Sequence, residues 1–221
     1  MNSTEHLITV ERTARYQTLG ELSPKTKTIW FALHGYGQLA KFFIRKFNGI
    51  MDEETFIVAP EGISRFYLDN KYDRIGASWI TREHRDLEAD EYIEFLNSVY
   101  DKITQDIDVQ NITINILGFS QGCATVCRWL NDGHISCKKL VLWAGFFTNG
   151  ITDMISPKKL EETETYYVYG EQDEFLVKYP EISEAFRSQM KEDIKPTVIP
   201  FEGTHRVDEK VLKELIDSWK K

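Results

Sequence analysis

The sequence contains little cysteine, with three residues in 221, an odd number. An odd, small count does not make a disulfide framework, and it fits a reducing compartment in which thiols stay free. The chain also lacks any apolar run that approaches the ~18 residues of a transmembrane helix. Residues 1–6 have neither the basic stretch nor the apolar stretch of a secretory signal. We therefore expect a soluble protein of the cytoplasm with no membrane span.

Basic residues are outnumbered, with 27 Lys and Arg against 35 Asp and Glu, so the net charge is −8. This balance argues against a protein that binds nucleic acid or membranes through a basic surface. It also mildly disfavours highly anionic substrates. Because the chain has no repeat, linker or low-complexity tract, we expect residues 1–221 to form a single domain.

Hydrophobic periodicity predicts strands that alternate with helices. Short apolar runs typical of strands buried on both faces occupy residues 29–33, 56–59, 112–117, 140–144, 166–169 and 198–201, and residues 7–16 alternate like a half-exposed strand. Helical spacing appears at residues 39–47, 86–103, 121–130, 181–190 and 211–219, the last with Asp208 as its cap. This order predicts an α/β fold with a mostly parallel sheet and helices on both faces.

The sequence G-F-S-Q-G at residues 118–122 directly follows a predicted strand and opens a predicted helix. The motif occurs by chance in Gly-rich turns, but in this setting it is typical of a nucleophilic serine on a sharp strand-to-helix turn. The flanking residues must be small because strand and helix pass close together. We predict that Ser120 is a nucleophile, with its hydroxyl at the positive end of a helix.

A nucleophile on such a turn is followed along the chain by an acid and then by a histidine that serves as the base. Two histidines follow Ser120. His134 adjoins a predicted helix end and is interpreted as an exposed capping residue. His205 comes directly after the last predicted strand and before the terminal helix, so we predict that it is the base.

The acid is expected at the end of the preceding strand, where residues 170–174 offer three carboxylates. We predict Asp173, because the turn after the strand needs a few residues before a side chain can reach back to His205. Glu171 and Glu174 are the alternatives, and as loop charges they are more typical of solvated side chains. In these roles Asp173 orients His205, which takes the proton of Ser120.

A tetrahedral intermediate needs preorganised N–H donors. The Gln121 amide follows the nucleophile and is one predicted donor. The Gly-rich loop at residues 33–38 ends an early strand, and the Tyr36 amide is the second predicted donor. His34 in this loop is interpreted as a buried, hydrogen-bonded residue. The loop lacks the glycine spacing and lysine of a phosphate cradle.

These motifs, with G-E-Q-D at residues 170–173 and G-T-H at residues 203–205, resemble the phospholipase/carboxylesterase group of α/β-hydrolases. That group includes acyl-protein thioesterases and small bacterial esterases. The resemblance implies the α/β-hydrolase fold, a Ser–Asp–His triad, no metal or cofactor, and ester or thioester substrates. Cys123 stands where the thioesterases have a second glycine, and Asp173 is not followed by their D-x-x-V-P pattern. A small bacterial-type esterase is therefore the closer resemblance.

The substrate pocket is expected to be apolar and uncapped. Tyr67, Trp79, Phe146 and Phe147 are predicted to line an acyl pocket, with ordinary packing as the alternative for each. The aromatic segment at residues 61–83 is expected to border the site, and residues 148–162 are too few for a large cap domain.

Two further groups of side chains can be interpreted either as structural or as functional. Arg74, Arg82 and Arg85 could recognise an acidic substrate, although salt bridges are favoured in so acidic a protein. Cys123 and Cys127 are four residues apart on a helix, but no other ligand accompanies them at suitable spacing. Buried packing thiols are therefore favoured over metal ligands.

The sequence as a whole predicts a serine hydrolase that cleaves carboxylic esters of small to medium acyl groups through an acyl-enzyme on Ser120. The alternatives are a thioesterase, lysophospholipase or peptidase with the same three residues, or a hydrolase-fold binding protein without catalysis. The expected partner is a small-molecule ester.

Overall fold

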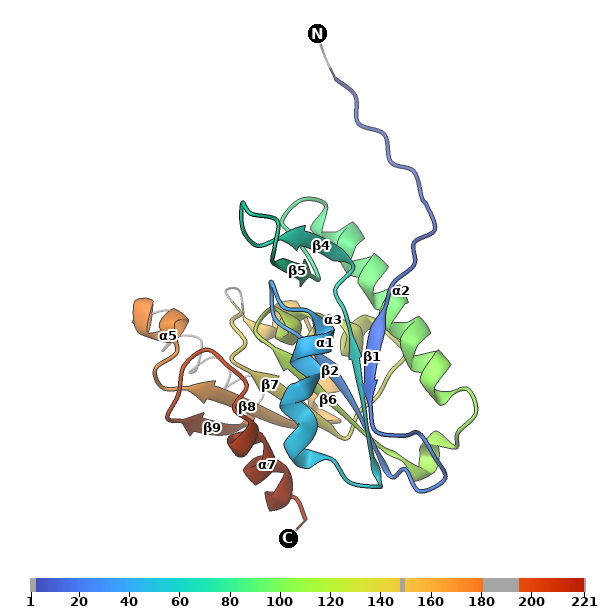
Figure 1. Cartoon of the computed structure of the whole chain (residues 1–221), viewed down its shortest axis with the longest axis vertical. Coiled ribbons are helices and arrows are strands. Elements are labelled where there is room, and N and C mark those ends of the chain that lie inside the picture. The colour runs from blue at the N-terminus through green and yellow to red at the C-terminus, as the bar shows by residue number, and fades with distance from the viewer. Residues whose placement is uncertain (1–2, 148–149, 181–194, 221) are drawn as a thin grey trace.

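The structure is a computed structural model that describes residues 3–147, 150–180 and 195–220. Its centre is a seven-stranded sheet with the strand order β1-β3-β2-β6-β7-β8-β9 (Figure 1). The strands are β1 (Tyr16–Leu19), β2 (Thr28–Leu33), β3 (Thr55–Pro60), β6 (Thr113–Phe119), β7 (Lys139–Trp143), β8 (Glu164–Gly170) and β9 (Thr197–Phe201). β1 is antiparallel to β3, and the other neighbouring strands are parallel. The predicted mostly parallel sheet is confirmed.

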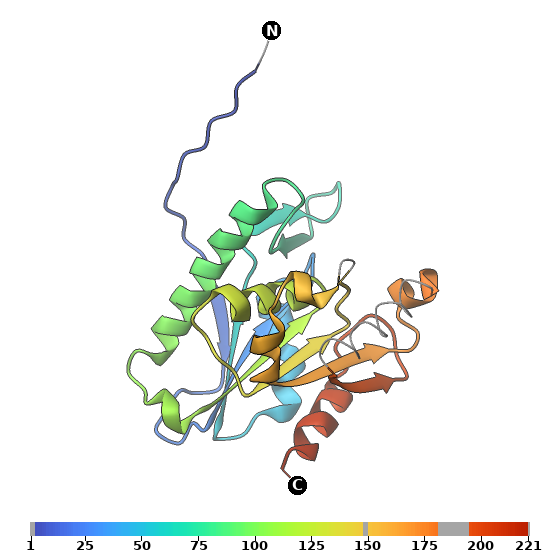
Figure 2. The ribbon, with the colours of Figure 1, turned by 180° about the vertical axis from the view of Figure 1, so that it is seen from behind.

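Helices cover both faces of this sheet (Figures 1 and 2). Successive residues of β2 point to opposite faces, so Ile29 and Phe31 lie in one core, while Trp30 and Ala32 lie in the other. The first core contains α2 (Arg85–Thr104) and α3 (Gln121–Asp132), and the second contains α1 (Ala40–Phe43), the 3-10 helix η1 (Ile44–Ile50) and α7 (Glu209–Ser218). The central strands read as continuous apolar runs because both of their faces are buried.

The terminal helix begins where the sequence predicts. The Asp208 side chain accepts the backbone N–H groups of Lys210 at 3.1 Å and Val211 at 3.2 Å, which caps α7. The predicted helix at residues 39–47 is divided between α1 and η1, and the one at residues 181–190 lies outside the described residues. Shorter helices are η2 (Val109–Asn111), η3 (Ile151–Asp153), α4 (Pro157–Glu161) and α5 (Glu174–Lys178). Among the helices described, none has the length and apolarity to cross a membrane.

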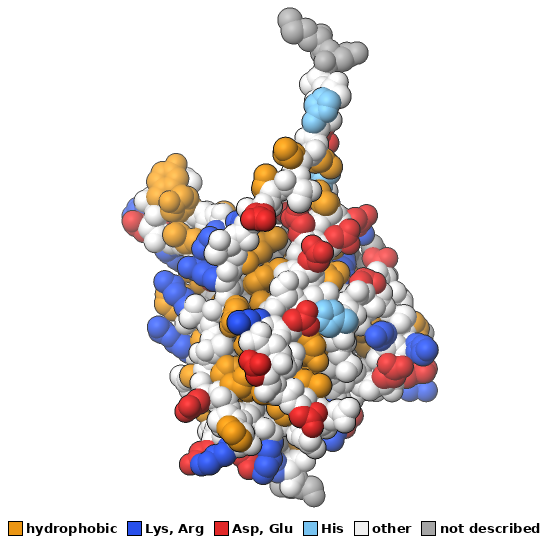
Figure 3. Space-filling view, turned by 90° about the vertical axis from the view of Figure 1, so that its right-hand side faces the viewer, with side chains coloured by type: hydrophobic (Ala, Val, Ile, Leu, Met, Phe, Trp, Pro, Cys, Tyr) orange, Lys and Arg blue, Asp and Glu red, His pale blue; other side chains and the backbone are white. Residues whose placement is uncertain are grey.

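Two strand predictions were wrong in part. Residues 3–15 form an extended arm that projects from the body, and β1 starts only at Tyr16 (Figures 1 and 3). Leu7, Ile8 and Val10 on this arm are exposed, because alternation cannot make a strand without a neighbour to pair with. β9 was expected to be buried on both faces, but as the edge strand it buries only Phe201 fully.

The aromatic segment at residues 61–83 forms a hairpin of β4 (Ser64–Tyr67) and β5 (Ile75–Ser78), which stands beside the upper edge of the sheet in Figure 1. It is tied to the loop after β2, where the Gly37 N–H donates to Ala77 O at 2.9 Å and the Ala77 N–H donates to Gln38 O at 3.1 Å. A Cβ on Gly76 would lie 2.6 Å from the carbonyl oxygen of Gly37. Glycine at this position therefore permits the two backbones to meet.

Candidate active site

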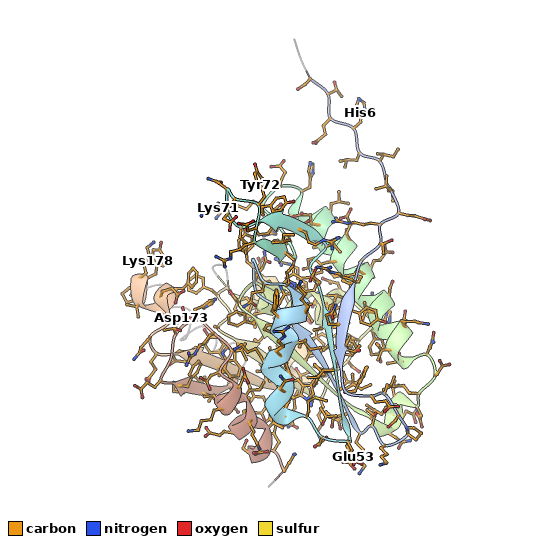
Figure 4. The ribbon with its side chains drawn as sticks, viewed as in Figure 1. His6, Glu53, Lys71, Tyr72, Asp173 and Lys178 are labelled. Carbon is orange, nitrogen blue, oxygen red and sulfur yellow. The ribbon has the colours of Figure 1, made fainter. Side chains whose placement is uncertain are left out.

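Four of the predicted site residues follow different strands of the sheet at one edge. Tyr36 follows β2, Ser120 follows β6, Asp173 follows β8 and His205 follows β9. The carboxyl ends of parallel strands meet at this edge, which is where α/β sheets bind ligands. Asp173 is labelled at this edge in Figure 4.

Ser120 has the strained backbone that the turn was expected to impose, with φ 52° and ψ −116°. Its N–H donates to Trp143 O at 2.9 Å, which fixes the turn against β7. A Cβ on Gly122 would lie 2.4 Å from the carbonyl oxygen of Leu33, and one on Gly118 would lie 2.5 Å from that of Gly122. Both glycines are therefore required by the close approach of strand and helix.

Ser120, His205 and Asp173 form a continuous hydrogen-bonded chain. The Ser120 hydroxyl lies 2.9 Å from Nε2 of His205, and Nδ1 of the same ring lies 2.6 Å from Oδ2 of Asp173. Asp173 is 2% exposed, and its second oxygen accepts the Phe175 N–H at 2.9 Å. The carboxylate thus orients His205, and Nε2 is left facing the hydroxyl.

The alternative acids and bases lie elsewhere. Glu171 and Glu174 are exposed, and His205 bonds Asp173 instead. The His134 side chain is half exposed and lies 2.7 Å from Asp101, away from the edge that carries Ser120. Two aromatic rings flank the His205 ring, with centroids 5.0 Å away for Phe119 and 4.7 Å away for Phe175. These rings restrict the ring plane of His205 without competing for its nitrogens.

At this edge the backbone amides of Gln121 and Tyr36 have no acceptor among the described residues. The Gln121 amide opens α3, where the first N–H groups of a helix lack intrahelical partners. The Tyr36 amide has no acceptor within the described chain. They are the two predicted oxyanion donors, which follow strands β6 and β2, and these strands pair directly in the sheet.

The Gln121 side chain ties α3 to the segment after β5, a structural role that the sequence does not predict. Its Oε1 accepts the Trp79 N–H at 3.0 Å, and its Nε2 donates to Ile80 O at 2.9 Å. The Trp79 indole N–H donates to His34 O at 2.9 Å. The hairpin segment therefore holds both the start of α3 and the loop that carries Tyr36. No local pattern signalled this, because Gln121 and Trp79 are far apart in the sequence.

Three of the four predicted pocket residues do not line the cavity beside Ser120. This cavity has a volume of about 330 Å³, and its described lining includes Phe146, Ala124, Phe175, Leu176 and Tyr179. Phe146 therefore lines this cavity, and its role in binding the acyl group stays a prediction. Trp79 and Phe147 are buried in the core, and Tyr67 is 54% exposed on the hairpin against Tyr72. The pocket interpretation was wrong for these three, because Trp79 and Phe147 pack into the core and the hairpin of β4 and β5 carries Tyr67 away from this cavity.

The cysteines behave as packing residues. All three are free and buried, and the Cys123 thiol contacts Gly118 O at 2.9 Å. Burial raises the pKa of Cys123 and Cys127 far above the usual thiol value and that of Cys137 to about 12. In the described ranges no three His, Cys, Asp or Glu side chains are grouped as metal ligands would be.

His34 is the buried loop residue that the sequence predicted, with 0% exposure. Its Nδ1–H donates to Gly35 O at 2.8 Å, and its Nε2 accepts the Gly62 N–H at 3.0 Å. These partners fix the neutral tautomer, because a proton on Nε2 would face another donor. Burial is the largest influence and lowers the pKa of His34 below 6.5.

We expect this histidine to make folding stability fall in mild acid. When the pH falls below 6.5, the usual pKa of histidine, His34 binds a proton in the unfolded chain but stays neutral in the folded chain. The free energy of unfolding then falls by up to about 1.4 kcal/mol per pH unit until the pH reaches the lowered folded value. Urea unfolding at pH 7.5, 6.5 and 5.5 measures this slope, and His34→Gln should flatten it. Wild-type stability that stays constant or rises over this range would contradict the expectation.

The sheet order, the strained serine turn and the later acid and histidine together define an α/β-hydrolase. The described residues contain no inserted cap, since η3, α4 and short connections fill the described part of the chain between β7 and β8. The chain belongs to the serine hydrolase (FSH1) family, whose model matches residues 23–211. A comparison with curated proteins finds no match.

Solved structures support the same fold. Acyl-protein thioesterase 2 from Zea mays matches with a TM-score of 0.68 and 12% identity over 94% of this chain and 98% of that one. SOBER1 from Arabidopsis thaliana matches with a TM-score of 0.61 and 16% identity over 88% and 97%. A Bacillus cereus carboxylesterase matches with a TM-score of 0.61 and 17% identity over 93% and 94%. At these identities the likeness shows the fold, and it agrees with the resemblance found in the motifs.

Proposed function

We propose that this member of the serine hydrolase (FSH1) family cleaves carboxylic esters of small to medium acyl groups through an acyl-enzyme on Ser120. The observation that carries the proposal is the hydrogen-bonded chain, in which the serine hydroxyl lies 2.9 Å from His205 and the ring lies 2.6 Å from buried Asp173. A nucleophile within reach of a base, and a base oriented by a carboxylate, is the arrangement that acyl transfer requires.

The steps follow from this geometry. The Ser120 oxygen attacks the ester carbonyl carbon while Nε2 of His205 takes the hydroxyl proton. The Tyr36 and Gln121 amides donate to the carbonyl oxygen as it becomes an oxyanion. When the intermediate collapses, the carbon–oxygen bond to the alcohol breaks and His205 gives that alcohol its proton. Water, activated by His205, then attacks the acyl-enzyme and releases the acid and Ser120.

The cavity beside Ser120 supports a small or medium acyl group. Its volume of about 330 Å³ lies near the lower end of the range for ligand pockets, and Ala124, Phe146 and Leu176 give it apolar walls. An acyl chain that stays attached to Ser120 would extend along these walls. Ser120, His205 and Asp173 could also cleave a thioester. The thioesterase among the solved structures keeps that substrate class as an alternative.

Active-site labelling combined with a chain-length series tests the proposal. A fluorophosphonate probe should label the protein once, on Ser120, as peptide mapping would show. Hydrolysis of p-nitrophenyl esters from acetate to palmitate should give the highest kcat/KM at intermediate acyl lengths and a steep fall at the longest. A protein that neither labels nor hydrolyses any ester, and yet binds an acyl ligand in calorimetry, would instead be a hydrolase-fold binding protein.

A further inference from the structure

A second cavity of about 550 Å³ opens on the other side of His205. It lies between the loop after β2 with α1, the hairpin loop, and the segment after β9. Its described lining consists of Gly37, Gln38, Leu39, Lys41, Phe42, Phe43, Lys46, Leu68, Asp73, Arg74, Ile75, His205, Arg206 and Val207. His205 is the residue that this groove shares with the cavity beside Ser120. We call it the hairpin groove.

The hairpin groove concentrates positive charge in an acidic protein. Four of its described lining residues are Lys or Arg, and Asp73 is the carboxylate among them. Lys46 pairs with Glu209 at 3.3 Å, and Arg206 pairs with Asp208 at 3.1 Å. The remaining two cations, Lys41 and Arg74, form no ion pair with the described chain. The Lys41 ammonium lies over the Phe42 ring, 4.8 Å from its centroid. No carboxylate of the described chain neutralises either charge, so both can attract an anionic ligand.

Salt bridges were the favoured interpretation of the arginines near the hairpin, and the structure separates them. Arg85 pairs with Asp86 at 3.4 Å, as that interpretation expects. Arg74 instead lines the groove with no carboxylate paired to it in the described residues. The floor beneath it is apolar, with Leu39, Phe43 and Val207 among its members. A cationic rim over an apolar floor suits a ligand with an apolar body and an anionic group.

The two cavities lie where the two halves of an ester on Ser120 would need space. Ser120 lines only the smaller cavity of the two, so the acyl group that becomes attached to it belongs there. His205 delivers the proton to the departing alcohol, so the alcohol must leave on a side that His205 faces. The hairpin groove begins at His205 and does not include Ser120. The groove therefore offers a space that a leaving group protonated by His205 could occupy.

We propose that the hairpin groove binds the alcohol half of the ester and that Lys41 and Arg74 select alcohols that carry a negative charge. This inference rests on the proposed function and names the substrate class within it. It also changes what the net charge of −8 implies, because the field beside His205 is set by nearby cations rather than by the whole chain. The acyl group of such a substrate stays apolar.

Two aryl butyrates that differ by one charge test the proposal. They are 4-nitrophenyl butyrate and 3-carboxy-4-nitrophenyl butyrate, which share the acyl group and release chromogenic phenols. The measured quantity is the kcat/KM of the anionic ester divided by that of the neutral one, compared between variants, so the differing reactivities of the esters cancel. Exposed charge pairs contribute modestly, so Lys41→Gln and Arg74→Gln should each lower this ratio about fivefold, and the double variant about twentyfold.

Lys71→Gln is the matched control. Lys71 is exposed on the same hairpin loop as Arg74 but does not line the groove, and it is labelled at the end of the hairpin in Figure 4. Its removal changes the net charge equally and should leave the ratio unaltered. Asp73→Asn removes the carboxylate from the groove and should raise the ratio. In wild type, 1 M salt should lower the ratio, since it screens charges beyond about 3 Å.

The outcomes separate this inference from the proposed function. In one outcome, the Lys41→Gln/Arg74→Gln variant still labels with fluorophosphonate and shows an unchanged ratio. That result would overturn the proposal that the groove selects anionic alcohols, and the proposed ester hydrolysis would stand. An equal fall in Lys71→Gln would also overturn it, because the effect would then come from net charge. If wild type neither labels nor cleaves either ester, the proposed function fails and the groove assignment fails with it.

Discussion

Replacing Ser120 with alanine is expected to lower kcat on p-nitrophenyl butyrate by a factor on the order of 10⁶, the loss that follows removal of a serine nucleophile from a well-evolved hydrolase. The hydroxyl that lies 2.9 Å from His205 is the atom that would carry the acyl group. No other hydroxyl is hydrogen-bonded to His205 within the described chain. Fluorophosphonate labelling should vanish together with turnover.

The variant should remain folded, because alanine and serine meet similar steric demands at φ 52°. Equal thermal midpoints for wild type and Ser120→Ala would show this. Ser98→Ala is a matched control, since it removes a hydroxyl from α2 that, within the described chain, bonds the Glu94 carbonyl and lies outside the site. It should retain wild-type turnover and labelling.

Non-additivity gives the prediction a second test. Ser120 and His205 act as a unit, so the double alanine variant should be about as slow as Ser120→Ala alone. The activity that remains above the uncatalysed rate would come from the Tyr36 and Gln121 amides and from binding. Wild-type kcat in Ser120→Ala would show that the chain hydrolyses esters, if at all, by another nucleophile.

The local parts of the site could be predicted because each depends on a few neighbouring residues. The motif at residues 118–122 fixes a turn, and the turn fixes the backbone of Ser120. The positions of His205 and Asp173 follow from the strand order, because parallel strands end at one edge. The observed distances between these three side chains agree with that reasoning.

The environment of the site could not be predicted in the same way, because it depends on pairing between distant segments. No residue near Trp79 in the sequence indicates that its indole donates to His34 O, so the sequence alone predicts a pocket wall at this position. The arm at residues 3–15 alternates like a strand but has no partner strand. Lys41 on α1 and Arg74 on the hairpin loop are far apart in the sequence, and only the fold places both in the lining of one groove.

The acid was the least determined of the three predicted residues, since Glu171, Asp173 and Glu174 lie within four positions. Geometry separates them. Asp173 is 2% exposed and bonded to His205, whereas both glutamates are exposed. Asp173 also begins α5, where its side chain accepts the Phe175 N–H at 2.9 Å. One carboxylate therefore both caps a helix and orients the histidine.

Asp173→Asn is expected to lower kcat by about 10⁴-fold while the fold is kept. The Phe175 N–H needs an acceptor, so the asparagine oxygen must face it and the amide nitrogen must face Nδ1 of His205. That amide donates to Nδ1, which moves the ring proton to Nε2. A protonated Nε2 donates to the Ser120 hydroxyl and cannot take its proton. The serine would then be present and correctly placed but without a base.

Glu171→Gln and Glu174→Gln are the matched controls, because each removes one carboxylate from the same short segment and should keep kcat within about twofold of wild type, as is usual for exposed side chains. Because the Nε2-protonated His205 cannot take the Ser120 proton, Ser120 in Asp173→Asn should react slowly, rather than not at all, with fluorophosphonate. A large loss in either glutamine variant, with Asp173→Asn close to wild type, would transfer the orienting role to that glutamate. A large loss in all three would mean that the negative charge of the segment, and not the bond to Nδ1, is what His205 requires.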